Sequence, residues 1–248
     1  MKKHYLCTCS YRGTNYFGFQ RQNKFPSVQE EIERALLFLF KEEITIKGAG
    51  RTDAKVHAKG QTFSFFSAPI ANKEKFLFAF NRLLPMDISV KDIKEVPFSF
   101  DARHSCIGKV YEYRFCFGEK DPFKTEFEAY IGKRDFNVIS FFDACEVFVG
   151  VHNFQSFTTK KEDKDGFIRD VTLISPKFDN KREAISIVFK SNGFMTYQIR
   201  LMVGALLKVG LGKLSKNDIK ERLESKSRNI MSFKAPGEGL TLLEVIYG

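Results

Sequence analysis

The amino-acid sequence predicts an α+β fold built in two rounds of strands and helices. Strand-like runs and segments with helical spacing of apolar residues follow one another in two successive rounds along the 248 residues. Consecutive strand-like runs often read as hairpins, so a strict β-α-β alternation is not expected. The chain is long enough to bury a substantial core in one large or two small domains.

The first round opens with a strand over Tyr5–Tyr11, and Ser27 can then cap a helix. Glu30, three residues after Ser27, would complete a capping box. The apolar positions after this cap recur at helical spacing: Ile32, Ala35, Leu36 and Leu39. They predict a helix that buries one face.

Two short strands are expected next, joined by a loop. The run Glu43–Ala49 is strand-like, and Gln61–Phe65 alternates polar and apolar residues, as a half-buried strand does. A second helix is expected over Lys73–Leu84, where Pro85 stops it, and a strand over Ile88–Val96 follows.

The second round follows a boundary at Asp101–Gly108, so we expect subdomains over residues 1–104 and 105–248. Its first strand, Tyr111–Phe117, alternates like a strand with one face in water. The remaining expected elements are the helix Phe136–Phe148, the strands Ile168–Phe178 and Ala184–Lys190, the helix Met195–Val209 closed by Gly210, and the strand Leu240–Tyr247.

The composition indicates a negatively charged partner. Lys and Arg number 40 against 30 Asp and Glu, a formal charge of +10, as in proteins that meet a polyanion. The five cysteines include no C-x-x-C pair and the four histidines are scattered, so we expect reduced thiols, no metal and a cytoplasmic location. Charges interrupt every long apolar run, so no membrane segment is expected.

The loop between the two strands of the first round carries the strongest chemical signal. Within Gly50–Ala58, Asp53 lies between Arg51 and His57. A loop held by two strands exposes a side chain and fixes its direction, which suits a catalytic carboxylate. The alternative is an Asx turn, in which the carboxylate only accepts backbone N–H groups. For His57 we expect a hydrogen-bonded histidine that shapes the turn.

The helix around Arg200 is a second, independent indication. Apolar residues cover nearly the whole circumference of this predicted helix, so we expect it to be buried. A guanidinium in that setting either reaches the surface or pairs with a carboxylate.

Further segments along the chain accompany these two. They are Tyr11–Gln22, Ser27–Glu30, Asn81–Pro85, Phe100–Arg103, Lys109–Tyr113, Gly150–Phe157, Gln198–Arg200 and Gly237–Leu240. Together with Gly50–Ala58, in this order and at these spacings, they resemble the TruA-type tRNA pseudouridine synthases, the tRNA pseudouridine 38-40 synthase family, nearly from end to end. A collinear set of motifs is far more specific than one short motif.

Three residues depart from the pattern of that family. Lys55 stands where the family usually has Gly, Phe19 where it has Trp, and Asn153 where it more often has Asp. Gly readily adopts a positive φ and Lys does not, so Lys55 raises a question about the backbone of the Asp53 loop.

The resemblance implies an isomerase that converts uridine to pseudouridine in the anticodon stem-loop of tRNA, at positions 38, 39 and 40. Asp53 would be the catalytic carboxylate, with Arg200 as its ion-pair partner. Arg51 would fill the space vacated by the flipped-out nucleotide or hold a phosphate, Tyr111 would stack on its uracil, and Leu240 would contact the base. The resemblance also implies two similar subdomains that meet at a central RNA-binding cleft, a homodimer with the tRNA across both subunits, and no cofactor or metal.

Other functions make different demands on the sequence. A synthase of the same family could act on another RNA, because base identity and RNA shape are read by different surfaces. A non-catalytic RNA-binding protein would also be basic and rich in aromatic residues, but it has no need of Asp53 together with Tyr111 and Arg200. A metal-dependent nuclease or phosphatase would need further carboxylates at ligand spacing beside Asp53 and His57, which the sequence does not supply.

Overall fold

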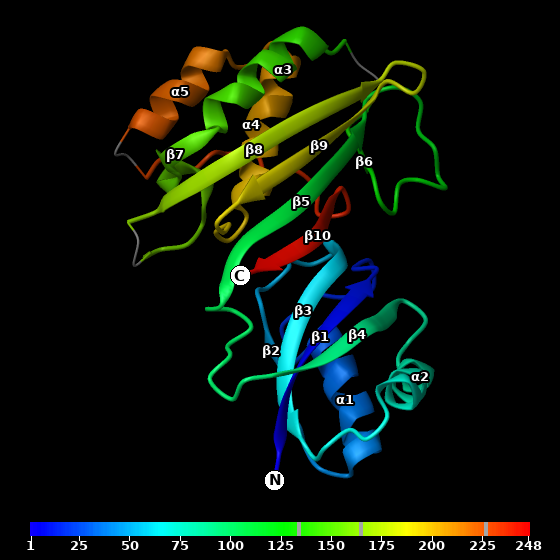
Figure 1. The fold of residues 1–248 in the computed structure, drawn as a ribbon. Coiled ribbons are helices and arrows are strands. Elements are labelled where there is room, and N and C mark those ends of the chain that lie inside the picture. The colour runs from blue at the N-terminus through cyan, green and yellow to red at the C-terminus, as the bar shows by residue number, and fades with distance from the viewer. Residues whose placement is uncertain (133–134, 164–165, 226–227) are drawn as a thin grey trace. The chain divides into compact units, whose positions relative to one another are not determined.

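The computed structural model describes residues 1–132, 135–163, 166–225 and 228–248 (Figure 1). Contacts between Cα atoms divide the chain into two compact units. Unit 1 consists of Met1–Ile107 and Thr241–Gly248, and unit 2 of Gly108–Leu240. The subdomains expected from the sequence, 1–104 and 105–248, place the last strand with the second half. Both units combine helices and strands, so the α+β class is confirmed.

Unit 1 is built on a sheet in which β4, β1, β3 and β10 are successive neighbours. Its strands are β1 (Lys3–Tyr11), β2 (Lys47–Gly48), β3 (His57–Ser67), β4 (Ile88–Val96) and β10 (Leu240–Tyr247). Strand β1 is antiparallel to both of its neighbours, and β10 is parallel to β3. Cys7 and Cys9 on β1 are fully buried, and burial raises the pKa of both thiols, which keeps them protonated.

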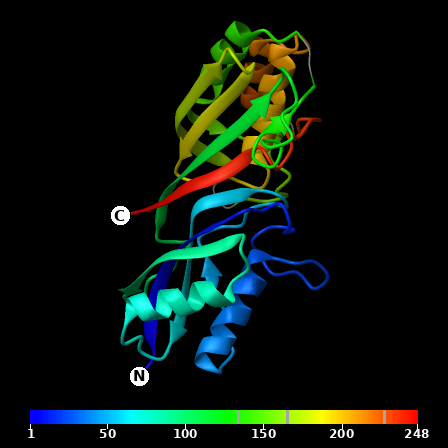
Figure 2. The same cartoon turned by 90° about the vertical axis from the view of Figure 1, so that its right-hand side faces the viewer.

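Helices α1 (Val28–Phe40) and α2 (Lys73–Leu83) contact each other beside this sheet (Figure 2). Ser27 caps α1 as expected, because its hydroxyl accepts a hydrogen bond from the Glu30 N–H at 3.3 Å. The Glu30 carboxylate turns to Arg21, with 3.7 Å between Oε1 and Nη2, and does not complete the expected capping box.

Unit 2 contains a sheet with the neighbour order β5-β9-β8-β7, and β6 pairs with β5. Its strands are β5 (Cys106–Cys116), β6 (Ala129–Tyr130), β7 (Gly150–Asn153), β8 (Ile168–Asp179) and β9 (Ala184–Ser191). The pairs Tyr111↔Phe189 and Tyr113↔Ile187 across β5 and β9 place four buried side chains on the core face.

The helical segments of unit 2 lie together beside its sheet, as Figures 1 and 2 both show. They are α3 (Val138–Cys145), α4 (Gln198–Gly210) and α5 (Lys216–Glu224), with the 3-10 helices η1 (Glu146–Phe148) and η2 (Gln155–Phe157). Helix α4 is buried at every residue except Arg200 and Lys208, so the prediction of a buried helix is confirmed. No helix in the described part of the chain is both long and apolar enough to cross a membrane.

Some expected elements differ from the observed ones. The strand expected over 43–49 shrinks to β2, because Ile44 and Ile46 bury their side chains without pairing in the sheet. The helix expected over 136–148 is observed as two pieces. The α-helix α3 begins at Val138 and ends at Cys145, and the 3-10 helix η1 continues it to Phe148. The helix expected from residue 195 begins at Gln198, because Tyr197 has a φ of 61°, outside the helical region.

Helix α5 was not expected from the sequence. It buries only Ile219 and Leu223, too few apolar positions to give a helical period. Its sequence signal lies at the N-terminus, where Ser215 and Asp218 form a complete capping box.

One side chain joins α2 to the sheet of unit 1. Asn81 Nδ2 donates to Leu77 O at 3.0 Å and to Val90 O at 2.8 Å, and Asn81 Oδ1 accepts from the Val90 N–H at 2.8 Å. This amide therefore pairs with both backbone polar groups of one residue in β4.

We expect Asn81→Ala to lower the free energy of unfolding by about 2–3 kcal/mol, because it leaves the polar groups of Val90 without this partner. Urea denaturation measures the loss. Asn217→Ala is the control: its exposed amide donates to Glu221 at 2.7 Å on the surface of α5, and its removal should cost less than about 0.5 kcal/mol. Equal losses in the two variants would contradict the joining role of Asn81.

Candidate active site

Asp53 lies in the loop between β2 and β3. The Val56 N–H donates to Asp53 O at 3.1 Å and closes a tight turn. Lys55, inside this turn, has a φ of 65°, the left-handed conformation that Gly adopts at less cost. The positive φ is therefore present although Lys55 replaces the usual Gly. Asp53 is half-buried, and Arg51 and Lys55 are exposed.

The segment between β1 and α1 holds this loop from one side. The Phe19 N–H donates to Thr52 O at 3.2 Å, and the Lys55 N–H donates to Tyr16 O at 3.2 Å. One bond lies immediately before Asp53 and the other lies two residues after it. The backbone that carries the carboxylate is thereby fixed at both ends of a short span.

Two glycines allow the close approach of these segments. A Cβ at Gly13 would lie 2.1 Å from Val56 O, and a Cβ at Gly18 would lie 2.5 Å from Thr52 O. Gly18 also has a φ of 108°, which side chains rarely tolerate. The Gly13 N–H donates to His57 Nδ1 at 3.0 Å, so His57 is hydrogen-bonded as expected, to the segment between β1 and α1.

Buried side chains of β1 and β3 complete the support of the loop. Gln61 Nε2 donates to Gly50 O at 3.0 Å, and the hydroxyls of Tyr11 and Thr52 lie 2.8 Å apart. Gln61 and Tyr11 are both buried, so both bonds are shielded from competing water.

Arg51 points out of the loop and has a defined neighbour. Its Nη1 donates to Gln20 Oε1 at 3.0 Å, and both side chains are exposed. A guanidinium has five N–H donors, so this single bond leaves donors for a phosphate or a nucleotide.

In unit 2, Arg200 is fixed to the segment that precedes β10. Its Nε donates to Ala235 O at 2.7 Å, and the Ala235 N–H donates to Arg200 O at 2.9 Å. The guanidinium carbon lies 5.4 Å from the centre of the Tyr197 ring. Arg200 is half-buried, as an arginine in an apolar helix must be if its charge is to stay solvated or paired.

The same segment contacts β5, the strand that carries Tyr111. Tyr113 OH donates to Pro236 O at 2.9 Å, and burial raises the pKa of this phenol, which keeps it a donor. A Cβ at Gly239 would lie 2.5 Å from Arg114 O, so this approach also needs glycine. Leu240 and Tyr111 are both buried, and the Tyr111 ring meets the Phe194 ring edge-on at 5.5 Å.

The predicted site residues thus fall into two groups. Asp53 and Arg51 share one loop of unit 1. In unit 2, Arg200 is hydrogen-bonded to Ala235, in the segment that leads into Leu240. The same segment contacts β5, the strand of Tyr111. The pairing of Arg200 with Asp53 would join the two units and stays a prediction, as do the catalytic and substrate-binding roles of all five residues.

Several supporting residues were not singled out from the sequence. Gln20, Gly13 and Gly18 lie within the motif over residues 11–22. The motif drew attention to this segment, but it did not predict the hydrogen bond of Gln20 or the close backbone contacts of the two glycines. Gln61 gave no signal beyond the alternation of its strand.

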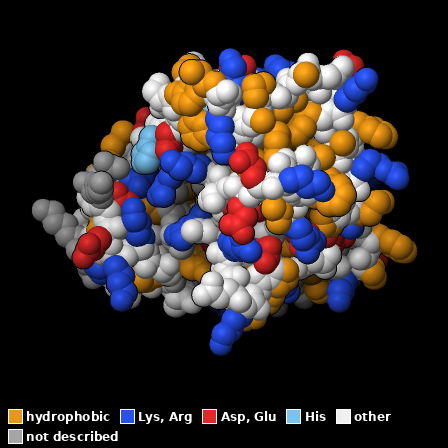
Figure 3. Space-filling view, turned by 90° about the horizontal axis from the view of Figure 1, so that it is seen from below, with side chains coloured by type: hydrophobic (Ala, Val, Ile, Leu, Met, Phe, Trp, Pro, Cys, Tyr) orange, Lys and Arg blue, Asp and Glu red, His pale blue; other side chains and the backbone are white. Residues whose placement is uncertain are grey.

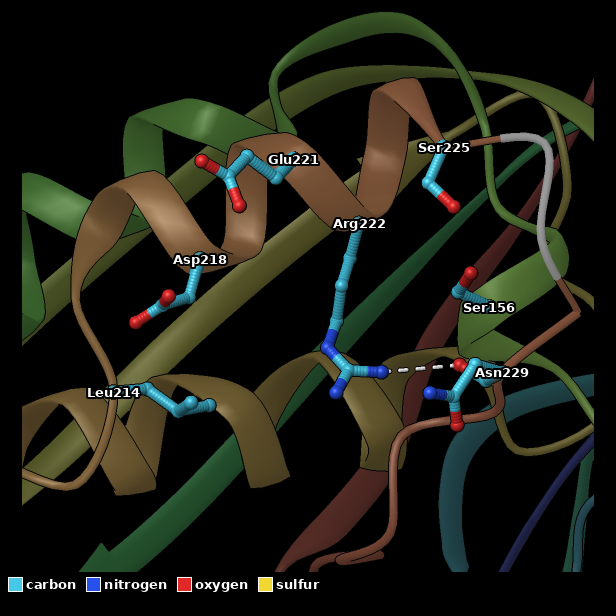
Figure 4. A pocket seen from close by; sticks show the side chains of 7 residues that line it. All are labelled: Ser156, Leu214, Asp218, Glu221, Arg222, Ser225 and Asn229. Atoms are coloured by element: carbon cyan, nitrogen blue, oxygen red, sulfur yellow. Dashed lines mark hydrogen bonds between the residues drawn. The ribbon is translucent and has the colours of Figure 1, made fainter.

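A separate pocket of about 340 Å³ lies in unit 2 beside α5 (Figure 4). Its lining residues are Ser156, Leu214, Asp218, Glu221, Arg222, Ser225 and Asn229. Arg222 Nη1 donates to Asn229 O at 3.1 Å at its edge. None of the five predicted site residues lines this pocket. Among the described residues, no three His, Cys, Asp or Glu side chains are placed to hold a metal ion.

We expect Gly18→Ala to lower the free energy of unfolding by roughly 2–4 kcal/mol, because the new Cβ would meet Thr52 O and strain the backbone. Gly212→Ala is the matched control: its φ is 66° and nothing lies within 4 Å of a new Cβ, so only about 1 kcal/mol should be lost. Urea denaturation of both variants tests this difference. If both lost the same amount, contact with the Asp53 loop would not constrain position 18.

Comparisons with known proteins identify the family of this chain. A family model described as tRNA pseudouridine synthase matches residues 8–105 and 144–248. The tRNA pseudouridine synthase A of Exiguobacterium sibiricum is 37% identical over 245 residues, which cover 99% of this chain and 97% of that protein. The enzyme of the same name from Anoxybacillus flavithermus is 38% identical over 242 residues, 97% of each chain.

Among solved structures, the crystal structure of a Cbf5-Nop10-Gar1 complex has a chain that matches 82% of this one and 45% of its own length, at a TM-score of 0.36 and 11% identity. That likeness is too weak to argue from. The family match and the similarity over nearly the whole length show that this chain belongs to the tRNA pseudouridine synthases, a family of isomerases.

Proposed function

We propose that this protein converts uridine to pseudouridine in the anticodon stem-loop of tRNA, at positions 38, 39 and 40. The observation that carries the proposal is Asp53, a half-buried carboxylate on a loop that is hydrogen-bonded to neighbouring segments on both sides. Membership of the synthase family supports the reaction. A carboxylate held in place before the substrate arrives can act without a further ordering step.

The reaction rearranges one nucleotide and leaves its atoms in balance. The bond between N1 and C1′ breaks, the uracil turns while it stays bound, and C5 bonds to C1′. The C5 proton is then lost and N1 gains a proton. No oxidant, reductant or hydrolysis is involved, so the isomerisation needs no cofactor. Asp53 acts near the ribose as a nucleophile or as a base toward the sugar, and both routes give the same product.

A uridine stacked in an RNA stem must leave the stack before it can react. We assign Arg51 to support this flipped state or to hold a phosphate beside it. Tyr111 stacks on the uracil and assists the removal of the C5 proton, and Leu240 contacts the base. Arg200 pairs with Asp53, which keeps the carboxylate ionised and aimed.

The charge of the protein supports an RNA substrate. The excess of ten positive charges suits a polyanion, and the face drawn in Figure 3 carries many Lys and Arg side chains among acidic and apolar ones. The family resemblance supports a homodimer with the tRNA across both subunits. It also supports a cytoplasmic location, which the five free cysteines suit.

Two other functions remain as alternatives with distinct signatures. A synthase of the same family that acts on another RNA would form pseudouridine, but outside the anticodon stem-loop. A non-catalytic RNA-binding protein would bind tRNA and form none.

We expect Asp53→Asn to lower the single-turnover rate at least roughly a thousandfold and to leave tRNA affinity nearly unchanged, because the amide keeps the shape but loses the charge and the nucleophile. Release of tritium from tRNA labelled at uracil C5 measures turnover directly. Asp92→Asn, the same change at an exposed residue of β4, is the control and should keep the parent rate. A near-parent rate in Asp53→Asn would remove Asp53 from the mechanism.

Mapping of pseudouridine in the reacted tRNA tests the substrate. We expect the new pseudouridines at positions 38, 39 and 40 only, and their absence from tRNA of cells that lack this gene. Pseudouridine elsewhere would favour the alternative RNA target, and tight binding without any product would favour the non-catalytic alternative.

Basic residues in polar loops should contact phosphates. Lys24 and Lys161 are exposed, and each replacement by Ala should reduce the slope of log affinity against log salt by about one unit while the saturated single-turnover rate stays constant. Arg21 and Lys160 are also exposed basic residues of polar stretches. Arg21 lies 3.2 Å from Glu33 and Lys160 lies 3.0 Å from Asp163, so we expect smaller changes in slope from these two.

Lys216→Ala is the control for this series. Its ammonium lies 2.6 Å from Asp143 Oδ1, so it is already paired within the protein. Filter binding at several salt concentrations gives all the slopes. A slope that changes equally in every variant would mean that net charge, and not these loops, sets the affinity.

A further inference from the structure

The segment between β1 and α1 presents a stacked pair of aromatic rings to solvent. Figure 2 shows this segment as a loop that extends to one side of α1. The rings of Phe17 and Phe25 lie 4.3 Å apart with 24° between their planes. They are 48% and 46% exposed, so each ring keeps much of its surface in water. The Phe17 N–H donates to Pro26 O at 3.0 Å, which holds the two ends of the loop together.

The pair is fixed to the loop that carries Asp53. Tyr16, directly before Phe17, accepts the Lys55 N–H at 3.2 Å. Gly18, directly after Phe17, lies so close to Thr52 O that a Cβ would come within 2.5 Å. Phe17 is therefore flanked directly by two residues that contact the Asp53 loop, and Phe25 stacks on its ring.

The charge around the pair suits a polyanion. Residues 12–26 contain Arg12, Arg21 and Lys24 and no Asp or Glu. Arg21 is paired with Glu33 of α1 at 3.2 Å, and the Arg21 N–H donates to Gln29 Oε1 at 3.1 Å. Arg21 thus ties the loop to α1, while Lys24 is exposed beside Phe25.

Exposed aromatic rings on a basic segment are the usual surface for unpaired nucleobases. Each base has a flat face, so stacking tolerates any sequence, and lysine or arginine nearby neutralises the backbone phosphates. Single exposed aromatic residues elsewhere, such as Phe78 on α2 at 71% exposure, are ordinary for a protein surface. Phe17 and Phe25 differ in two respects: their rings stack on each other, and they lie in a segment with basic and no acidic residues. That segment is also hydrogen-bonded to the Asp53 loop.

We propose that the Phe17–Phe25 pair is a stacking surface for one unpaired nucleobase of the RNA substrate, close to the target uridine. The base stacks on an exposed ring face and holds the RNA loop while the uridine is out of its stack. The inference rests on the proposed function, because it takes the anticodon stem-loop as the ligand.

A coupling experiment tests the contact. Anticodon stem-loops are prepared with one abasic nucleotide at each loop position in turn. Their affinities are measured for proteins with Asp53→Asn, so that no RNA is converted, alone and combined with Phe17→Leu, Phe25→Leu or Phe78→Leu. Phe78→Leu is the matched control, an equally conservative change at an exposed ring.

We expect one abasic position to weaken binding roughly fivefold or more, and Phe25→Leu to weaken binding of the intact stem-loop by a similar factor. In the Phe25→Leu protein the same abasic position should cause no further loss, whereas Phe78→Leu should leave that loss intact. Phe17→Leu should behave like Phe25→Leu if it folds, which urea denaturation checks. Phe25 lies farther along the chain from Gly18 and its contact with Thr52 O. The Phe25→Leu variant therefore still tests the proposal if Phe17→Leu is unstable.

Additive losses at every abasic position would overturn the proposal, because the rings would then not contact a single base. Loss of dimers in sedimentation by the Phe25→Leu variant, without any coupling to an abasic position, would also overturn it and would assign the rings to contact between two copies of the chain. Tritium release by the parent protein is measured in parallel. Coupling without tritium release would refute the proposed activity but keep the stacking contact, and tritium release without coupling would refute the stacking contact alone.

Discussion

The backbone hydrogen bonds between residues 16–19 and 52–55 are the constraint on which the rest of the candidate site depends. A free loop residue loses about 1–2 kcal/mol of conformational entropy when it is fixed. Here the neighbouring segment fixes the loop during folding, so that cost is not left for the moment of RNA binding. The left-handed Lys55 fits the same account. Its own N–H bonds to Tyr16 O, and this bond offsets the roughly 1 kcal/mol that a non-glycine residue needs there.

Unit 2 uses the same device at a different place. Segment 233–240 approaches α4 and β5 at two glycines: a Cβ at Gly204 would lie 2.0 Å from Phe233 O, and Gly239 meets Arg114 O. Backbone packed this closely leaves little freedom, and Arg200 is bonded to Ala235 through both its side chain and its carbonyl. In both units, a glycine without a side chain lets two backbone segments pack closely. This packing restricts the segments next to Asp53 in unit 1 and Arg200 in unit 2.

Local patterns predicted much of the fold. The strand-like run at Tyr5–Tyr11, the alternation at Gln61–Phe65, the cap at Ser27 and the apolar circumference of α4 are short-range signals, and each lies in the expected type of element. The expectation that 61–65 is half-buried was wrong, because all five of its residues are buried. The strand predicted over 43–49 was too long. Ile44 and Ile46 are apolar because their side chains are buried, although they do not pair with a strand of the sheet. Helix α5 was missed because a mostly solvated helix carries its signal in its cap.

The site was predicted unevenly for the same physical reason. Asp53 could be identified from the sequence because Arg51 and His57 lie within a few residues of it. Gln20 and Arg51 are 31 residues apart, and Gln61 and Gly50 are 11 apart, so no local spacing announces their hydrogen bonds. Contacts of this kind are properties of the packed sheet, and only the three-dimensional structure brings them together.

The return of the last strand to unit 1 has a consequence for synthesis on the ribosome. Residues 1–107 are made before unit 2, but β3 lacks its parallel neighbour β10 until residues 241–248 have been made. On the edge of β3 opposite β1, β2 already pairs with Phe63 and Ser64. The pairing of His57 and Ala58 with β10 is still missing while unit 2 is translated, and a strand edge in that state can pair with the wrong chain. Thr241↔His57 and Leu242↔Ala58 close this edge at the point where the Asp53 loop enters β3. The nascent chain thus completes the base of its candidate catalytic loop only after unit 2 has been made.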